Sequence, residues 1–150
     1  MDEFEGFMGA ALAEAARAAE AGEVPVGAVV VRDGKIIARA HNQVEQLRDA
    51  TAHAEMLALT AAAEAVGDWR LDGCTLGVTL EPCAMCTGAA LLSRVDRIVY
   101  GAADPVAGAC GSVLRLHDEA KLPRRVEVEG GVMGEECGAI LKKFFRSLRR

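Results

Sequence analysis

Two cysteines three residues apart could bind a metal ion. Cys83 and Cys86 follow Pro82 at the start of an alanine-rich run that favours a helix. Because residues i and i+3 share one face of a helix, both thiols can point at one ion from the first turn. The positive end of the helix dipole favours the thiolate, which is the form that binds metal.

A Cys-x-x-Cys pair alone does not identify the site, because redox dithiols and structural zinc knuckles use the same spacing. A His-x-Glu pattern, at His53 and Glu55, supplies a third ligand. It also lies at the beginning of an apolar helical run. Two helix ends are therefore expected to face one ion.

One histidine and two cysteines leave one position of a tetrahedral zinc ion to water, as in catalytic sites. Zinc lowers the pKa of bound water to about 7, which supplies a zinc-bound hydroxide at neutral pH. Glu55 is then the candidate that carries protons between this water and a substrate. His-x-Glu followed by Pro-Cys-x-x-Cys is typical of zinc deaminases. A structural zinc knuckle and a redox dithiol remain the alternatives at this point.

The apolar pattern predicts elements that could hold these residues. Helices are expected at 4–21, 53–66, from 83, and at 134–148, and strands at 25–31, 36–40, 74–80, 97–101 and 125–128. Asp33-Gly34 between two of the strands predicts a hairpin, and residues 43–50 a loop. We expect one zinc-dependent deaminase domain, 1–150, with a three-layer α/β/α sandwich around a five-stranded mixed sheet. The site would lie beyond the strand ends.

Composition and charge limit the partners. The chain has 150 residues, 51% hydrophobic content and a net charge of -5. Residues 139–150 contain five cations and no acid, which permits contact with a polyanion, although a solvated helix face is the alternative. The lack of a long apolar run and the acidic N-terminus indicate a cytoplasmic protein with no membrane partner. The other cysteines, Cys74, Cys110 and Cys137, are expected to be free core thiols, and His117 a surface residue.

Several motifs together carry a resemblance to a known family. They are 23–28 (Glu-Val-Pro-Val-Gly-Ala), His41-Asn42, 51–55 (Thr-Ala-His-Ala-Glu), 69–71 (Trp-Arg-Leu), 79–83 (Thr-Leu-Glu-Pro-Cys), Ser93-Arg94, Asp104-Pro105, Gly111-Ser112 and 144–146 (Phe-Phe-Arg). Over nearly its whole length the chain resembles bacterial wobble-position tRNA adenosine deaminases of the cytidine deaminase superfamily. The resemblance implies a cytidine deaminase-like fold and a homodimer with one Zn²⁺ per subunit. It also implies hydrolytic deamination of adenosine to inosine at the wobble position of a tRNA anticodon.

The resemblance also implies residue roles. His53, Cys83 and Cys86 would bind zinc, and Glu55 would be catalytic. The substrate would contact Asn42, the backbone of Ala54, Val26 and Asp104. Contacts to phosphates of the anticodon stem-loop are expected from the arginines Arg70, Arg94, Arg146, Arg149 and Arg150. The chain departs from many relatives at Ala103 and Val106, where a charged residue and a lysine are common in a loop thought to touch RNA.

Two other functions fit part of these features. A zinc-dependent deaminase of a free nucleobase or nucleoside, of guanine or cytosine type, would share the zinc ligands and Glu55 but needs no basic tail. A non-catalytic zinc-stabilised binding module would share only the metal ligands. Deamination of an anticodon stem-loop, compared with free nucleosides, distinguishes the first two functions. Replacement of Glu55 distinguishes both from the third.

Overall fold

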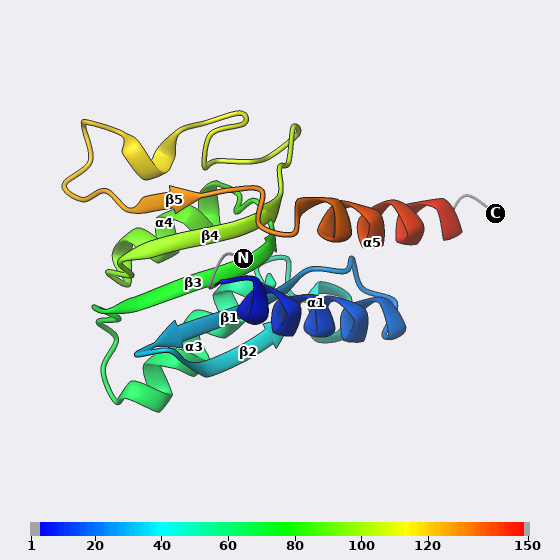
Figure 1. Ribbon diagram of the computed structural model, residues 1–150, viewed down its shortest axis with the longest axis horizontal. Helices are drawn as coiled ribbons and strands as arrows, with labels where there is room; N and C mark the ends of the chain where they lie inside the picture. The colour runs from blue at the N-terminus through cyan, green and yellow to red at the C-terminus, as the bar shows by residue number, and fades with distance from the viewer. Residues whose placement is uncertain (1–3, 149–150) are drawn as a thin grey trace.

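Five strands form one mixed sheet in the computed structural model, which describes residues 4–148. The sheet order is β2-β1-β3-β4-β5, where β1 pairs antiparallel with β2 and β3, and β4 pairs parallel with β3 and β5. The strands are β1 Gly27–Arg32, β2 Lys35–His41, β3 Cys74–Leu80, β4 Arg97–Ala102 and β5 Glu127–Glu129. The five-stranded mixed sheet that the sequence predicted is confirmed (Figure 1).

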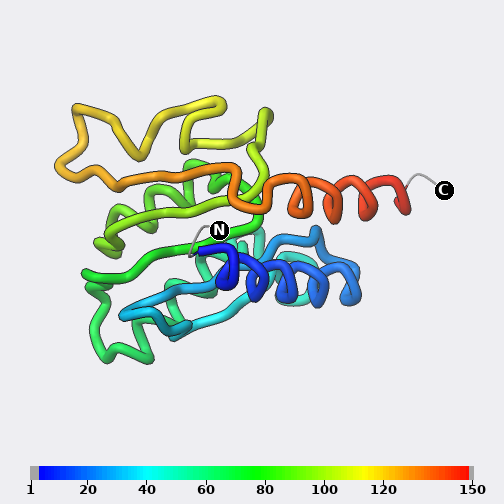
Figure 2. The backbone as a smooth tube through the Cα atoms, viewed as in Figure 1, coloured from blue at the N-terminus to red at the C-terminus, as the bar shows by residue number. Residues whose placement is uncertain are grey.

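Helices cover both faces of this sheet. On one face lie α1, Glu5–Glu20, and α5, Gly134–Ser147, and on the other lie α3, Ala54–Val66, and α4, Ala84–Leu92. The tube in Figure 2 shows α1 and α5 running alongside each other, with the C-terminal turns of α5 extending beyond the sheet. The three-layer α/β/α arrangement is therefore confirmed.

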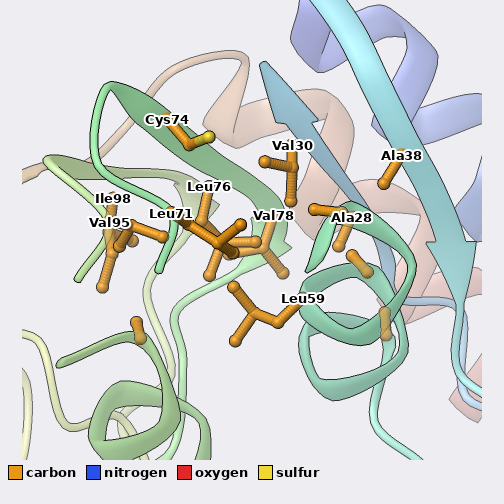
Figure 3. Close-up of a cluster of buried hydrophobic side chains, with 14 of the residues drawn as sticks. Ala28, Val30, Ala38, Leu59, Leu71, Cys74, Leu76, Val78, Val95 and Ile98 are labelled. Atoms are coloured by element: carbon orange, nitrogen blue, oxygen red, sulfur yellow. The ribbon is translucent and has the colours of Figure 1, made fainter. Parts of the chain in front are cut away.

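Aliphatic side chains build the core. The larger cluster lies between the sheet and the face of α3 and α4, where Leu59 packs near Leu76, Val78 and Ile98 (Figure 3). A smaller cluster lies under α1 and includes Phe4 and Met8. Small and β-branched residues allow these layers to pack closely although aromatic residues make up only 4% of the chain. The expected core thiols, Cys74, Cys110 and Cys137, are all free and buried.

The β1–β2 hairpin turns at Asp33 and Gly34, as the sequence predicted. Both residues have positive φ, at 51° and 73°. This is the conformation that a two-residue hairpin with the twist of its flanking strands requires, and Asp-Gly adopts it readily. The hairpin places the end of β2, with Asn42 directly after it, beside the start of β1 at Gly27.

Three local expectations were wrong. The 43–50 segment contains a short helix, α2 Val44–Leu47, because the distant carboxylate of Glu23 accepts hydrogen bonds from the N–H groups of Glu45 and Gln46. His117 is buried, not on the surface, because its 3-10 turn packs against α4. The first and fifth strands begin at Gly27 and Glu127, each two residues later than expected.

No helix within residues 4–148 is both long enough and apolar enough to cross a lipid bilayer.

Candidate active site

Three metal-ligand side chains meet at the N-terminal ends of two helices. His53 is the N-cap residue of α3 and Cys83 the N-cap residue of α4, and Cys86 lies in the first turn of α4. The Nδ1 atom of His53 is 3.7 Å from Sγ of Cys83 and 3.5 Å from Sγ of Cys86. All three ligand atoms lie within 4.8 Å of one another. The structure thus brings together the three predicted ligands from segments 30 residues apart.

This donor set fits zinc. Zn–N bonds of about 2.0 Å and Zn–S bonds of about 2.3 Å at a tetrahedral angle place nitrogen and sulfur about 3.5 Å apart. The two distances from His53 Nδ1 agree with that separation. The soft thiolates and the imidazole are also the ligand types that zinc prefers. His53, Cys83 and Cys86 therefore form a zinc-binding group.

The acid–base properties of the two thiols differ. The pKa of Cys83 is lowered to about 3, because Cys86 and then His53 donate hydrogen bonds to its sulfur. The pKa of Cys86 is raised, because its thiol is the donor to Cys83 and because it is buried. The pKa of His53 is raised by its hydrogen bond with Cys83. Cys83 is therefore a thiolate before any metal arrives, as metal binding requires.

Glu55 lies in the first turn of α3 beside the metal ligands. It is 4% exposed and lines the same cavity as His53 and Cys83. Burial raises its pKa to about 7, although the charge of His53 and hydrogen bonds from its own backbone and Cys86 act in the opposite direction. A carboxyl group with a pKa close to neutral can both accept and donate a proton at the same pH.

A cavity of about 480 Å³ opens over these residues. The four predicted substrate contacts, Val26, Asn42, Ala54 and Asp104, all line it. Asn42 is held in place because its Nδ2 donates to the carbonyl of Val24 at 3.2 Å and its Oδ1 accepts from Val44 N–H at 3.3 Å. The volume suits a ligand of nucleobase or nucleoside size.

Sequence reasoning missed one wall of this cavity. Phe144 and Phe145 of α5 and its C-cap residue Leu148 line it, with Phe145 44% exposed and Leu148 64% exposed. Their spacing predicted a helix but gave no sign that its last turns extend past the sheet (Figure 1) and line the cavity. The only available signal was a strongly apolar helix face next to a cluster of cations.

Two of the predicted RNA contacts, Arg70 and Arg94, lie away from the cavity. Arg70 and Arg94 flank the exposed Trp69, with their guanidinium carbons 4.5 Å and 6.0 Å from its ring centroid. This group lies at the Cys74 end of β3, because Leu71 N–H donates to Ser93 and Asp96 N–H donates to Cys74. The zinc group lies beyond the opposite end of β3. Arg146 is exposed on α5, and Arg149 and Arg150 lie outside the described residues.

A second hollow of about 530 Å³ lies at the sheet edge by β5. It is lined by side chains of both charges, among them Arg97, Arg125 and Glu127. The metal-ligand group that the described residues contain is not in this hollow. The chemistry therefore points to the cavity above His53.

Comparison with known proteins agrees with this geometry. Residues 1–102 match the cytidine and deoxycytidylate deaminase zinc-binding region. The chain is 51% identical to the tRNA-specific adenosine deaminase of Bacillus subtilis (strain 168) over 150 residues, covering 100% of this chain and 93% of the relative. The chain belongs to the tRNA-specific adenosine deaminase family. The corresponding protein of Aquifex aeolicus (strain VF5) is 48% identical over 95% of this chain and 94% of its own length.

Solved structures of related deaminases resemble this zinc-dependent tRNA adenosine deaminase. One structure, from a study of A-to-I editing by tRNA:A34 deaminases at the wobble position of transfer RNA, has a TM-score of 0.88 and 45% identity, covering 91% of this chain and 99% of that one. A guanine deaminase from Nitrosomonas europaea has a TM-score of 0.82 and 28% identity, covering 93% and 83%. The cytidine deaminase-like fold is thus confirmed, and the redox dithiol and non-catalytic module are not supported.

Proposed function

We propose that the protein hydrolytically deaminates adenosine to inosine at the wobble position of a tRNA anticodon. The observation that carries this proposal is the zinc group of His53, Cys83 and Cys86 beside the buried Glu55. It occurs in a chain that aligns over its full length with a protein named for this activity on tRNA. Both the chemistry and the family membership support the same reaction.

Glu55 moves the protons of this reaction. Zinc, when bound by the three ligands, supplies a water that is acidic enough to react at neutral pH. Glu55 would accept a proton from the water that adds to C6 and deliver it to N1 of adenine. It then transfers the second proton to the amino group, which leaves as ammonia. Its buried carboxyl group lies in the same cavity as the metal ligands, which places it for both transfers.

The residues above the zinc group would hold the base. Ala54 is the first residue of α3, so its N–H lacks an intrahelical acceptor and can donate to the ring. Asn42 uses one Nδ2 hydrogen for Val24 and one oxygen lone pair for Val44, which leaves a donor and an acceptor for the base. Val26 supplies an apolar surface against the ring face, and Asp104 would lie beside the nucleotide.

An anticodon loop suits such a buried site. A base must leave its stack to reach Glu55, and an unpaired loop nucleotide loses less stacking and pairing than a paired one. Lys142, Lys143 and Arg146 are exposed on α5 next to the turn that lines the cavity. We propose that these cations, with Arg149 and Arg150, contact phosphates of the bound stem-loop.

Arg70 and Arg94 require a second subunit in this proposal. β3 has seven residues, and a strand rises about 3.3 Å per residue, so its two ends are about 20 Å apart. Arginines at the Cys74 end are far from a base in the pocket of the same chain. In a homodimer, which we propose as the active form, they would contact RNA that is bound at the partner's pocket.

The direct test is to incubate the purified zinc protein with a synthetic anticodon hairpin that bears adenosine at the wobble position. We expect inosine in the hairpin and little deamination of free adenosine, guanine or cytidine. The structural likeness to a guanine deaminase makes free guanine the competing substrate to include. Deamination of guanine without any inosine in the hairpin would replace this proposal by the nucleobase alternative.

A further inference from the structure

Glu81 is a buried carboxylate whose bonds are all to one loop. It is 2% exposed and follows the last residue of β3, two residues before the zinc ligand Cys83. No lysine or arginine forms an ion pair with it among residues 4–148. A charge removed from water needs hydrogen-bond donors in place of water, and here one peptide segment provides them.

That segment is the loop at 104–112. Oε1 of Glu81 accepts from Asp104 N–H at 3.0 Å and from the Ser112 hydroxyl, and Oε2 accepts from the N–H groups of Cys110 and Ser112, each at 3.0 Å. A side chain at Gly108 would collide with the Glu81 carboxyl group. The loop thus wraps around the carboxylate, and only glycine fits at its closest approach.

The same loop forms one side of the base pocket. Asp104 and Ala107 line the cavity, and Oδ1 of Asp104 accepts from the N–H groups of Val106 and Ala107. The loop is also tied to the zinc side of the cavity, because Ala109 N–H donates to the carbonyl of Pro82 at 2.8 Å. The position of this wall relative to Cys83 therefore depends on the contacts around Glu81.

We infer that Glu81 is a positioning residue that fixes the 104–112 loop, and with it Asp104, against the nucleotide in the base pocket. The inference rests on the proposed function, because it assigns the loop to substrate binding. Glu81 does not touch the reacting atoms in this account. Its carboxylate holds the irregular loop in one conformation before the substrate arrives, so that binding does not have to order it.

The test replaces Glu81 by glutamine, which keeps the shape but sets an amide N–H₂ against the N–H groups of the loop. Glu64→Gln, the same change on the exposed surface of α3, is the matched control. For each protein we would measure hydrogen exchange of the loop amides, the zinc content, and kcat and KM for the anticodon hairpin. We expect faster exchange at Asp104, Cys110 and Ser112, unchanged zinc, and a KM raised about tenfold or more with kcat little changed.

Two other results would overturn the inference. Loss of zinc in Glu81→Gln would show that the residue supports the metal ligands, not the loop. Faster loop exchange with an unaltered KM would show that the loop does not position substrate. Wild-type protein that makes no inosine would instead refute the proposed function, whereas a working wild type with an unaffected Glu81→Gln refutes only this inference.

Gly108→Ala covers the case in which Glu81→Gln does not fold. The added methyl group meets the carboxylate from the loop side and leaves Glu81 itself intact. We expect the same rise in KM and the same faster exchange. A double variant that combines Gly108→Ala with Asp104→Ala should raise KM no further than Asp104→Ala alone, because Glu81 acts through Asp104. Additive effects of the two substitutions would contradict that route.

Discussion

At the scale of single residues, the proton transfer proposed for Glu55 is a different role from metal binding. Its carboxyl group lies beside the zinc ligands but is not one of the three. We expect Glu55→Ala to lower kcat for the hairpin by a factor of about 10² to 10⁴, the usual contribution of a positioned acid–base group. Inosine formation and zinc content should be measured on the same sample, because zinc should stay at one ion per chain.

Glu64→Ala on the exposed side of the same helix is the control for Glu55→Ala, and it should keep full activity. His53→Ala is the opposite case, since it should lose zinc and activity together. Full activity of Glu55→Ala would contradict the assigned role of this residue.

The buried thiol of Cys137 should make the stability of the protein depend on pH in the alkaline range. Burial, with a smaller effect of Glu136, raises the pKa of Cys137 to about 11. The unfolded chain, where a thiol has a pKa of about 8.5, therefore ionises first as the pH rises. The stability due to the neutral thiol is complete below that value and is lost between about pH 9 and 11. We expect the Tm of the wild type to fall over this range.

Cys137→Ala is the comparison for this alkaline transition. The alanine variant starts from a lower Tm because it leaves space at a position that is fully buried. Its Tm should nevertheless fall less steeply between pH 9 and 11 than that of the wild type. Equal slopes in the two proteins would mean that Cys137 does not titrate differently on folding.

At the scale of elements, α5 packs on the protein at one position and lines the cavity at its C-terminal end. Of its residues only Cys137 is buried, while Phe144, Phe145 and the C-cap residue Leu148 line the cavity. The exposed cations at 142, 143 and 146 therefore lie close to any RNA that enters. Removing the three arginines, Arg146, Arg149 and Arg150, should reduce the slope of log K against log salt by about 0.7 for each phosphate that they neutralise.

The salt dependence should be measured by hairpin binding at several salt concentrations. Arg17→Ala, which removes an exposed cation on α1 that pairs with Glu14, is the control and should leave the slope unchanged. A triple variant with the slope of the wild type would show that these arginines do not bind phosphates.

The elements that could be predicted from the sequence are those specified locally. The β1–β2 hairpin follows from Asp33-Gly34 between two apolar runs, and α3 ends at Gly67, which adopts the left-handed conformation that glycine favours. The zinc ligands were also predictable, because His53 and the two cysteines have a chemistry that few other arrangements share.

The parts that could not be predicted depend on distant partners. The helix α2 forms because Glu23 accepts N–H groups 22 and 23 residues further on. Glu81 similarly holds amides up to 31 residues away. Residue type alone does not indicate which loop a buried carboxylate will meet. The direction of α5 could not be predicted for the same reason, since an apolar helix face does not indicate which part of the protein it packs against.

At the scale of the whole molecule, the zinc group and two of the proposed RNA contacts lie at opposite ends of β3. The zinc group and base pocket lie beyond Leu80, and the Trp69 group with Arg70 and Arg94 lies near Cys74. Two copies arranged as a homodimer could bring the arginines of one subunit to the pocket of the other. Each pocket would then need two chains for full RNA affinity, although its chemistry needs only one.

Mixed dimers test this arrangement. One chain carries Arg70→Ala and Arg94→Ala with an intact zinc site, and the other carries Glu55→Ala with both arginines intact. Neither homodimer should deaminate the hairpin efficiently, the first because its KM is raised and the second because it lacks Glu55. In the mixed dimer the intact pocket of the first chain faces the arginines of the second, so kcat/KM should recover towards one half of the wild-type value. A partner that lacks Glu55 and both arginines should give no recovery, and recovery with that partner would show that the arginines do not act across the dimer.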